Sequence, residues 1–185
     1  MTFRDYLHTQ NRCLNWRERE DYAPSLRLMA RVPEGRGWAL EIGSCRGMEA
    51  VQLAAKGYRV FGIDLFPGLL REAKPGPSYA VADMHAIPVG ARAVRLVYAN
   101  NGIEHAHDVR CALAEIARVL VPGGRFCGAL PLRAAWWSEA HLWSVDTPEE
   151  LRAVFAAMCP TLRLEWMEFM EDTEPQCLFV LMKAG

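Results

Sequence analysis

The sequence lacks an excess of charge of either sign: it has 21 basic and 22 acidic residues, and its formal net charge is −1. The chain as a whole therefore creates no field that would attract nucleic acid or an anionic membrane surface. It also lacks an apolar run of roughly 18 residues, the length that a membrane helix needs, and its first residues lack the apolar core of a signal peptide. We expect a cytoplasmic protein whose partner is neither nucleic acid nor a membrane.

The sequence lacks closely spaced cysteine pairs as well. Its cysteines lie far apart in apolar surroundings, which favours reduced, buried thiols over a disulfide framework. They are Cys13, Cys45, Cys111, Cys127, Cys159 and Cys177. A chain of 185 residues that is 51% hydrophobic is long enough to bury one full core. We therefore expect a single globular domain.

Apolar, strand-like runs alternate with helical patterns from Trp38 onward, which predicts strand-helix units and a mainly parallel sheet. The predicted strands are 38–42, 58–63, 78–82, 94–99 and 125–130. Residues 108–120 repeat apolar positions at helical spacing, and Pro122-Gly123-Gly124 is predicted to end that helix. Asp108 is predicted to cap its start.

The last part of the chain predicts one helix and two further strands. Thr147, Pro148 and Glu150 form a capping-box start before an apolar stripe at helical spacing. The runs 162–170 and 176–183 are strand-like and flank an acidic segment that contains a proline, so they predict a closing antiparallel hairpin.

The turn in "LEIGSCRG" (residues 40–47) follows the first predicted strand and opens into a helical stretch. Such a turn directs backbone N–H groups and a positive helix end at a ligand. A nicotinamide-binding turn would read G-x-G-x-x-G, whereas Gly43 and Gly47 have a different spacing, and Glu41 stands two residues before the first glycine. A carboxylate there suits a ligand with positive charge, such as a sulfonium or ammonium group.

Five segments together carry a resemblance to a known family. They are "LEIGSCRG" (40–47), "VFGIDL" (60–65), "VADMHAIP" (81–88), "YANNGIEHAHD" (98–108) and "IARVLVPGGRF" (116–126). In this order they resemble the class I S-adenosylmethionine-dependent methyltransferases, in the small-molecule, type 11-like branch. The resemblance implies a Rossmann-like α/β fold: a seven-stranded, mainly parallel sheet with helices on both faces and a C-terminal antiparallel hairpin.

The resemblance also implies residues that bind S-adenosylmethionine. The first turn would hold the methionine part, Asp64 the ribose, Asp83 and Met84 the adenine, and two asparagines the amino-acid end, with Leu65 as a further cofactor-binding residue. The first-turn residues are Glu41, Gly43, Ser44, Cys45 and Gly47, and the asparagines are Asn100 and Asn101. Plainer alternatives stay open: Glu41 as an edge charge, Asp64 and Asp83 as caps, the asparagines as turn residues. Cys45 stands where the family most often has glycine, and we expect binding to survive unless the backbone there has positive φ.

Candidates for acceptor chemistry are fewer. His141, in a tryptophan-rich insert, and His105 are candidate general bases, since imidazole titrates near neutral pH. Aromatic residues in such an insert are either simple packing or the lid of a substrate pocket; they are Trp136, Trp137 and Trp143. No metal site is expected, because His105, His107 and Asp108 have no matching second cluster.

The resemblance implies methyl transfer by in-line displacement from S-adenosylmethionine to a small acceptor of aromatic or apolar character, with S-adenosylhomocysteine as product. Two alternatives remain: a non-catalytic partner subunit that binds S-adenosylmethionine, and a nicotinamide-dependent oxidoreductase. Within the single domain of residues 1–185 we expect four parts. They are a helical cap or lid (1–36), the cofactor-binding core (37–130), a substrate-side insert (131–146), and a helix with the closing hairpin (147–185).

Overall fold

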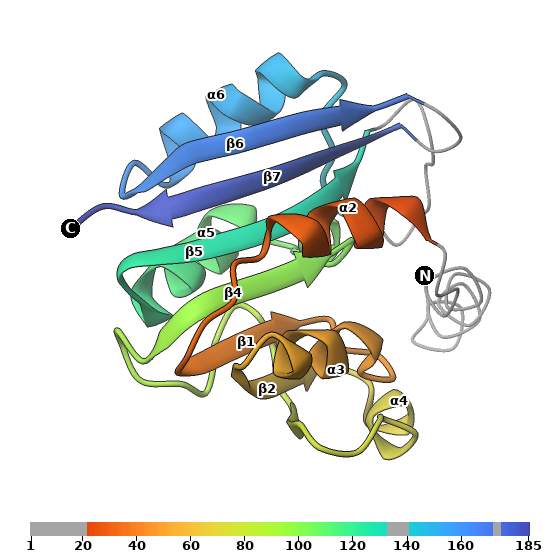
Figure 1. The fold of residues 1–185 in the computed structure, drawn as a ribbon. Coiled ribbons are helices and arrows are strands. Elements are labelled where there is room, and N and C mark those ends of the chain that lie inside the picture. Colours follow the sequence, from red (N-terminus) through yellow and green to blue (C-terminus); the bar gives the residue numbers. More distant parts are fainter. Residues whose placement is uncertain (1–21, 133–140, 172–174) are drawn as a thin grey trace.

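The computed structural model describes residues 22–132, 141–171 and 175–185. Its centre is a seven-stranded sheet in the order β3-β2-β1-β4-β5-β7-β6 (Figure 1). The strands are β1 (Trp38–Ile42), β2 (Arg59–Asp64), β3 (Ser78–Val81), β4 (Val94–Asn100), β5 (Leu120–Pro131), β6 (Leu162–Met170) and β7 (Gln176–Lys183). β1 to β5 pair in parallel, and β7 is antiparallel to both β5 and β6. The predicted fold class and the closing hairpin are confirmed.

Helices cover both faces of this sheet (Figure 1). On one face, α2 (Ala23–Arg31) and α3 (Met48–Ala55) bury Leu28 and Leu53 in one apolar cluster. On the other, α5 (Val109–Val119) and α6 (Pro148–Met158) bury Ile116 and Phe155 in a second cluster. The short α4 (Pro67–Arg71) and the 3-10 helix η1 (Ile103–His105) follow β2 and β4. The sheet is therefore the middle of three layers, as the alternating pattern predicts.

Both predicted helix caps are present. The Asp108 carboxylate accepts a hydrogen bond from the Cys111 N–H at 3.0 Å, and the Thr147 hydroxyl accepts one from the Glu150 N–H at 3.1 Å. The Glu150 side chain reaches back one residue further than in a standard capping box, to the Asp146 N–H at 2.7 Å. Each cap satisfies amide groups that the first turn of a helix leaves without a partner.

The prediction that Pro122-Gly123-Gly124 ends a helix is wrong in one respect. The helix α5 already ends at Val119, and the Pro-Gly-Gly segment lies inside β5. The ladder between β4 and β5 shifts register there, from the pair Val94 and Leu120 to the pair Leu96 and Arg125. The two glycines therefore form a bulge that bends a strand, a use of glycine that a helix-end pattern does not reveal.

The connection from β1 leads to β2 on one side, while β4 pairs with β1 on the other. Strand order therefore reverses between β1 and β4, and open α/β sheets bind ligands at the carboxyl ends of strands at such a point. In the part of the chain that the structure describes, no helix is long and apolar enough to cross a membrane. Within the expected cap (1–36), α2 packs on the sheet face, and residues 1–21 lie outside the described residues.

Candidate functional site

The turn after β1 is anchored on the end of β2. The N–H groups of Gly43 and Ser44 both donate to the Ile63 carbonyl, at 2.9 and 3.0 Å, and Ser44 also donates its hydroxyl to the Glu41 carboxylate. Gly43 and Gly47 have φ values of +71° and +73°, which glycine adopts without strain. Glu41 is 1% exposed, so in this structure its carboxylate helps to hold the turn from inside.

Cys45 adopts the conformation that its side chain resists. Its φ is 48°, in the left-handed region where a non-glycine residue costs about 1–2 kcal/mol. The side chain is partly buried and packs against Phe66 and Leu69. From the sequence, cofactor binding is expected to survive unless the backbone at Cys45 has positive φ. The structure has positive φ at this cysteine.

Asp64, the last residue of β2, joins the first turn to the loop after β2. Its Oδ2 accepts from the Cys45 N–H and its Oδ1 from the Phe66 N–H, both at 2.9 Å. The bond to Phe66 is a local turn contact, and α4 has no side-chain cap, so the alternative that Asp64 caps this helix is not realised. A carboxylate has about four acceptor positions, so Asp64 keeps capacity for two further donors, as two ribose hydroxyls would require. Leu65 beside it is half exposed.

Asp83 follows β3 and is bonded within its own turn. Its Oδ1 accepts from the His85 N–H at 2.9 Å and lies 2.5 Å from the His85 Nδ1. Burial acts to raise the pKa of the Asp83 carboxyl, but these bonds to His85 outweigh it and lower the pKa. Met84 is half-buried against the larger core cluster. The contacts of Asp83 fit the capping alternative, and its adenine role stays a prediction.

The two asparagines after β4 behave differently. The Asn100 amide nitrogen donates to the Ser25 hydroxyl at 2.5 Å and to Glu49 at 2.9 Å, which ties β4 to α2 and α3. Asn101 has a φ of 49° and is 5% exposed, and its side-chain amide forms no hydrogen bond with any described residue. A buried amide without a partner costs about 1–3 kcal/mol. Both polar atoms of the Asn101 side chain are therefore available to a ligand at this edge.

The structure brings the two predicted general bases together. The rings of His105 and His141 lie edge to face, with centroids 5.2 Å apart. Trp143 is partly buried against the core, and its indole N–H donates to the Ile103 carbonyl at 2.5 Å, so its visible contacts are those of a packing residue. Trp136 and Trp137 lie outside the described residues.

The other members of the "HAHD" segment point elsewhere. The His107 ring stacks on His85 with centroids 3.7 Å apart, and Asp108 caps α5. The loop cluster that the sequence suggests is thus divided between two places in the fold.

Sequence reasoning missed three buried polar residues near the site: Ser25, Glu49 and Glu104. Ser25 and Glu49 bond each other at 3.3 Å as well as Asn100. Their partners lie tens of residues away along the chain, so no local pattern could have identified them.

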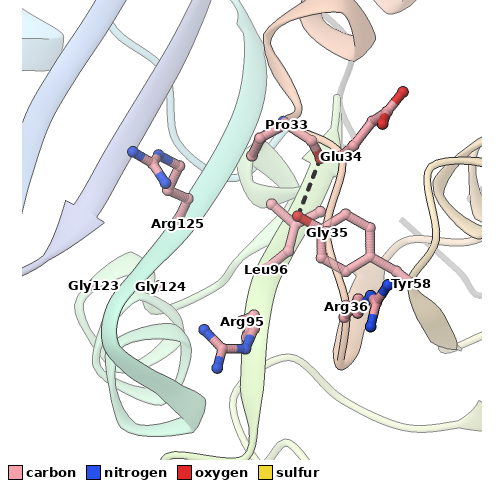
Figure 2. Close-up of a pocket in the computed structure, with 10 residues that line it drawn as sticks. All are labelled: Pro33, Glu34, Gly35, Arg36, Tyr58, Arg95, Leu96, Gly123, Gly124 and Arg125. Atoms are coloured by element: carbon pink, nitrogen blue, oxygen red, sulfur yellow. Dashed lines mark hydrogen bonds between the residues drawn. The ribbon is translucent and has the colours of Figure 1, made fainter.

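A separate cavity of about 320 Å³ lies at the opposite end of the sheet (Figure 2). Three arginines line it, Arg36, Arg95 and Arg125, and the Tyr58 hydroxyl there donates to the Pro33 carbonyl at 3.2 Å. Because Arg95 lies at the start of β4, this cavity is at the amino ends of the strands and is distinct from the glycine turn.

Comparison with known proteins agrees with this geometry. Residues 40–128 match the sequence model of a family described as "Methyltransferase domain". The chain is 34% identical over 114 residues to the malonyl-[acyl-carrier protein] O-methyltransferase of Salmonella typhimurium, covering 55% of this chain and 45% of that protein. It is 32% identical over 120 residues to the trans-aconitate 2-methyltransferase of Methylobacterium radiotolerans, covering 62% and 46%. The matched stretches thus amount to about half the length of these curated relatives.

Among solved structures, the geranyl diphosphate C-methyltransferase of Streptomyces coelicolor A3(2) superposes with a TM-score of 0.73 and 15% identity, covering 90% of this chain and 87% of that one. At this identity the likeness shows the fold alone. The sheet order and the switch-point turn define a Rossmann-like methyltransferase fold. Residues 40–128 match a methyltransferase family model and the curated relatives are methyltransferases, so the resemblance to the class I S-adenosylmethionine-dependent methyltransferases is confirmed for this part of the chain.

Proposed function

We propose that this chain binds S-adenosylmethionine at the carboxyl ends of β1, β2 and β4 and transfers its methyl group to a small-molecule acceptor. The observation that carries the proposal is Asn101, whose buried amide forms no hydrogen bond with a described residue. It stands directly beside the glycine turn, because a Cβ at Gly43 would lie 3.8 Å from the Cα of Gly102.

The residues present fit this cofactor. Gly43 has no side chain and a Cβ there would meet no atom closer than 3.8 Å, so a ligand can approach the main chain of the turn closely at this residue. Asp64 has acceptor capacity for two ribose hydroxyls, and Asn101 offers both a donor and an acceptor for the amino-acid end. Glu41, held inside the turn by Ser44, adds negative charge near a cationic ligand.

When bound, S-adenosylmethionine would supply a methyl group already activated on a sulfonium sulfur. The protein therefore needs no nucleophile of its own, and its residues would align the acceptor and exclude water. His105 and His141 could accept a proton from a hydroxyl or ammonium acceptor. We propose an acceptor of small size with aromatic or apolar character, beside which Trp143 would lie.

We also propose a cytoplasmic location. Five cysteines of the described residues are free. Burial raises the pKa of the Cys127 thiol to about 12 and that of the Cys177 thiol to about 11, which keeps both protonated and slow to form disulfides.

Calorimetric titration with S-adenosylmethionine and S-adenosylhomocysteine tests the cofactor assignment. We expect the wild type to bind both and Asp64→Ala to bind at least about tenfold more weakly, since it leaves two ribose hydroxyls without a charged acceptor. Glu34→Ala is the matched control, because it removes the same charge from an exposed site at the other end of the sheet. Thermal unfolding of each variant shows whether the loss of the Cys45 and Phe66 contacts unfolds the protein.

The same titration separates the alternatives. Binding of NAD without S-adenosylmethionine would replace the proposal with an oxidoreductase. Cofactor binding without S-adenosylhomocysteine production, over a panel of small acids, phenols and amines, would favour a non-catalytic binding subunit. Unchanged affinity in Asp64→Ala would remove this residue from the site.

A further inference from the structure

Three potential metal ligands meet at the carboxyl end of β4: Glu104, His105 and His141. One donor atom from each lies within 4.8 Å of the others, and the His105 Nε2 is 3.9 Å from a Glu104 carboxylate oxygen. Glu104 is 1% exposed and His141 5%, while the His105 side chain is 17% exposed. These three residues, called the Glu-His-His cluster below, are therefore an interior feature of the fold.

Backbone bonds fix the approach of His141. The Leu142 and Trp143 N–H groups both donate to the Glu104 carbonyl, at 2.9 and 3.4 Å, and the Trp143 indole N–H donates to the Ile103 carbonyl at 2.5 Å. The chain that carries His141 is thus attached directly to the 3-10 helix that carries the other two ligands. Main-chain hydrogen bonds therefore hold the segment of His141 next to the segment of Glu104 and His105.

The imidazole arrangement agrees with metal binding. A ring centroid lies about 3.2 Å from a Zn²⁺ ion bound at its usual distance, so two rings at a tetrahedral angle have centroids about 5 Å apart. The rings of His105 and His141 have centroids 5.2 Å apart and planes inclined by 62°. Small side-chain rotations would bring the donor atoms from within 4.8 Å to the roughly 3.4 Å of a tetrahedral site.

We propose that the Glu-His-His cluster binds one divalent first-row transition-metal ion. Transition-metal ions of the first row bind well to a donor set of two imidazoles and one carboxylate, whereas Mg²⁺ and Ca²⁺ favour oxygen ligands alone.

Three protein ligands leave at least one coordination position open to water or to an acceptor oxygen. A bound ion lowers the pKa of such an oxygen group and orients it, and this would take the place of proton acceptance by His105 and His141, whose ligating nitrogens the ion would occupy. This consequence for the acceptor depends on the proposed methyl transfer, whereas metal binding itself does not.

The test is a titration of chelator-treated protein with Zn²⁺ in the absence of S-adenosylmethionine, with the bound metal counted by mass spectrometry. The wild type should bind one ion per chain. Glu104→Gln and His141→Ala should each weaken Zn²⁺ binding at least about a hundredfold. Loss of a residue that only hydrogen-bonds a metal ligand typically weakens binding about tenfold to a hundredfold. His107→Ala is the control, because that histidine stacks on His85 outside the cluster and its loss should leave Zn²⁺ affinity unchanged.

Thermal unfolding identifies any variant that fails to fold. Zn²⁺ should raise the unfolding temperature of wild type and His107→Ala but not that of folded Glu104→Gln, which keeps the shape of the native residue. The metal site would be overturned if the wild type did not bind one Zn²⁺ ion per chain. It would also be overturned if Glu104→Gln and His141→Ala bound Zn²⁺ as tightly as the wild type. Cofactor titration of the same samples is scored separately: cofactor binding without metal binding overturns only the metal site, and the reverse overturns only the proposed function.

Discussion

The geometry of the glycine turn makes its two outer glycines unequal. Gly43 and Gly47 have almost the same backbone conformation, with φ of +71° and +73°. A Cβ added at Gly43 would meet nothing closer than 3.8 Å, whereas one added at Gly47 would lie 2.1 Å from the Tyr79 hydroxyl oxygen. Gly43→Ala and Gly47→Ala therefore share a backbone penalty, and only the second adds a clash.

The magnitudes follow from these contacts. A left-handed conformation costs alanine about 1–2 kcal/mol, and the stiffer unfolded chain returns about 0.4–1 kcal/mol, so Gly43→Ala should lose about 1 kcal/mol of unfolding free energy. In Gly47→Ala the tyrosine must also move, which breaks its 3.0 Å bond to the Lys74 carbonyl and disturbs its packing, for about 2 kcal/mol more. The total for Gly47→Ala is about 3 kcal/mol.

Urea unfolding without cofactor measures both variants against wild type. We expect Gly47→Ala to be less stable than Gly43→Ala by about 2 kcal/mol. Equal losses in the two variants would contradict the close approach of Tyr79, and no loss in either would contradict the positive φ values of the turn.

Two further predictions concern Asn101 and Glu115. Asn101→Gly keeps the positive φ and removes a buried amide whose lack of a described partner costs about 1–3 kcal/mol, so the unfolding free energy should not fall. S-adenosylmethionine affinity in calorimetry should fall about tenfold. Unchanged affinity would exclude this amide from the site. Glu115→Gln should cost about 1 kcal/mol at pH 7, because the carboxylate binds the Arg118 guanidinium and the Ile87 N–H, and partial exposure weakens the ion pair. The hydrogen bond to Arg118 lowers the pKa of Glu115, so the stability that the carboxylate contributes is present above about pH 4.5 and is lost as the pH falls through the lowered pKa. The unfolding free energies of wild type and Glu115→Gln should therefore converge in acid. A difference that stays constant with pH would refute the ion pair.

The sequence predicted the strands and the two capped helices because their signals are local. Short apolar, strand-like runs predict β1 to β5, and the cap residues Asp108 and Thr147 stand directly before their helices. The bulge at Gly123 and Gly124 was misread because the same residues also end helices, and only pairing with β4 decides between the two uses.

The sequence predicted which segments end at this edge of the sheet but not the contacts among their side chains. Motif order located the turn, Asp64 and Asn101 at one edge, since parallel strands end together. The bonds of Asn100 to Ser25 and Glu49, and the approach of His141 to Glu104, depend on how distant segments pack on the sheet. No periodicity or spacing encodes such contacts.

The most direct test of the central claim is a crystal structure with S-adenosylhomocysteine bound. The account predicts the ligand across the carboxyl ends of β1 and β4, with its ribose hydroxyls on the Asp64 carboxylate and its amino-acid end at the Asn101 amide. Ligand in the arginine-lined cavity at the opposite end of the sheet, beside Arg36 and Arg95, with the glycine turn empty, would contradict it.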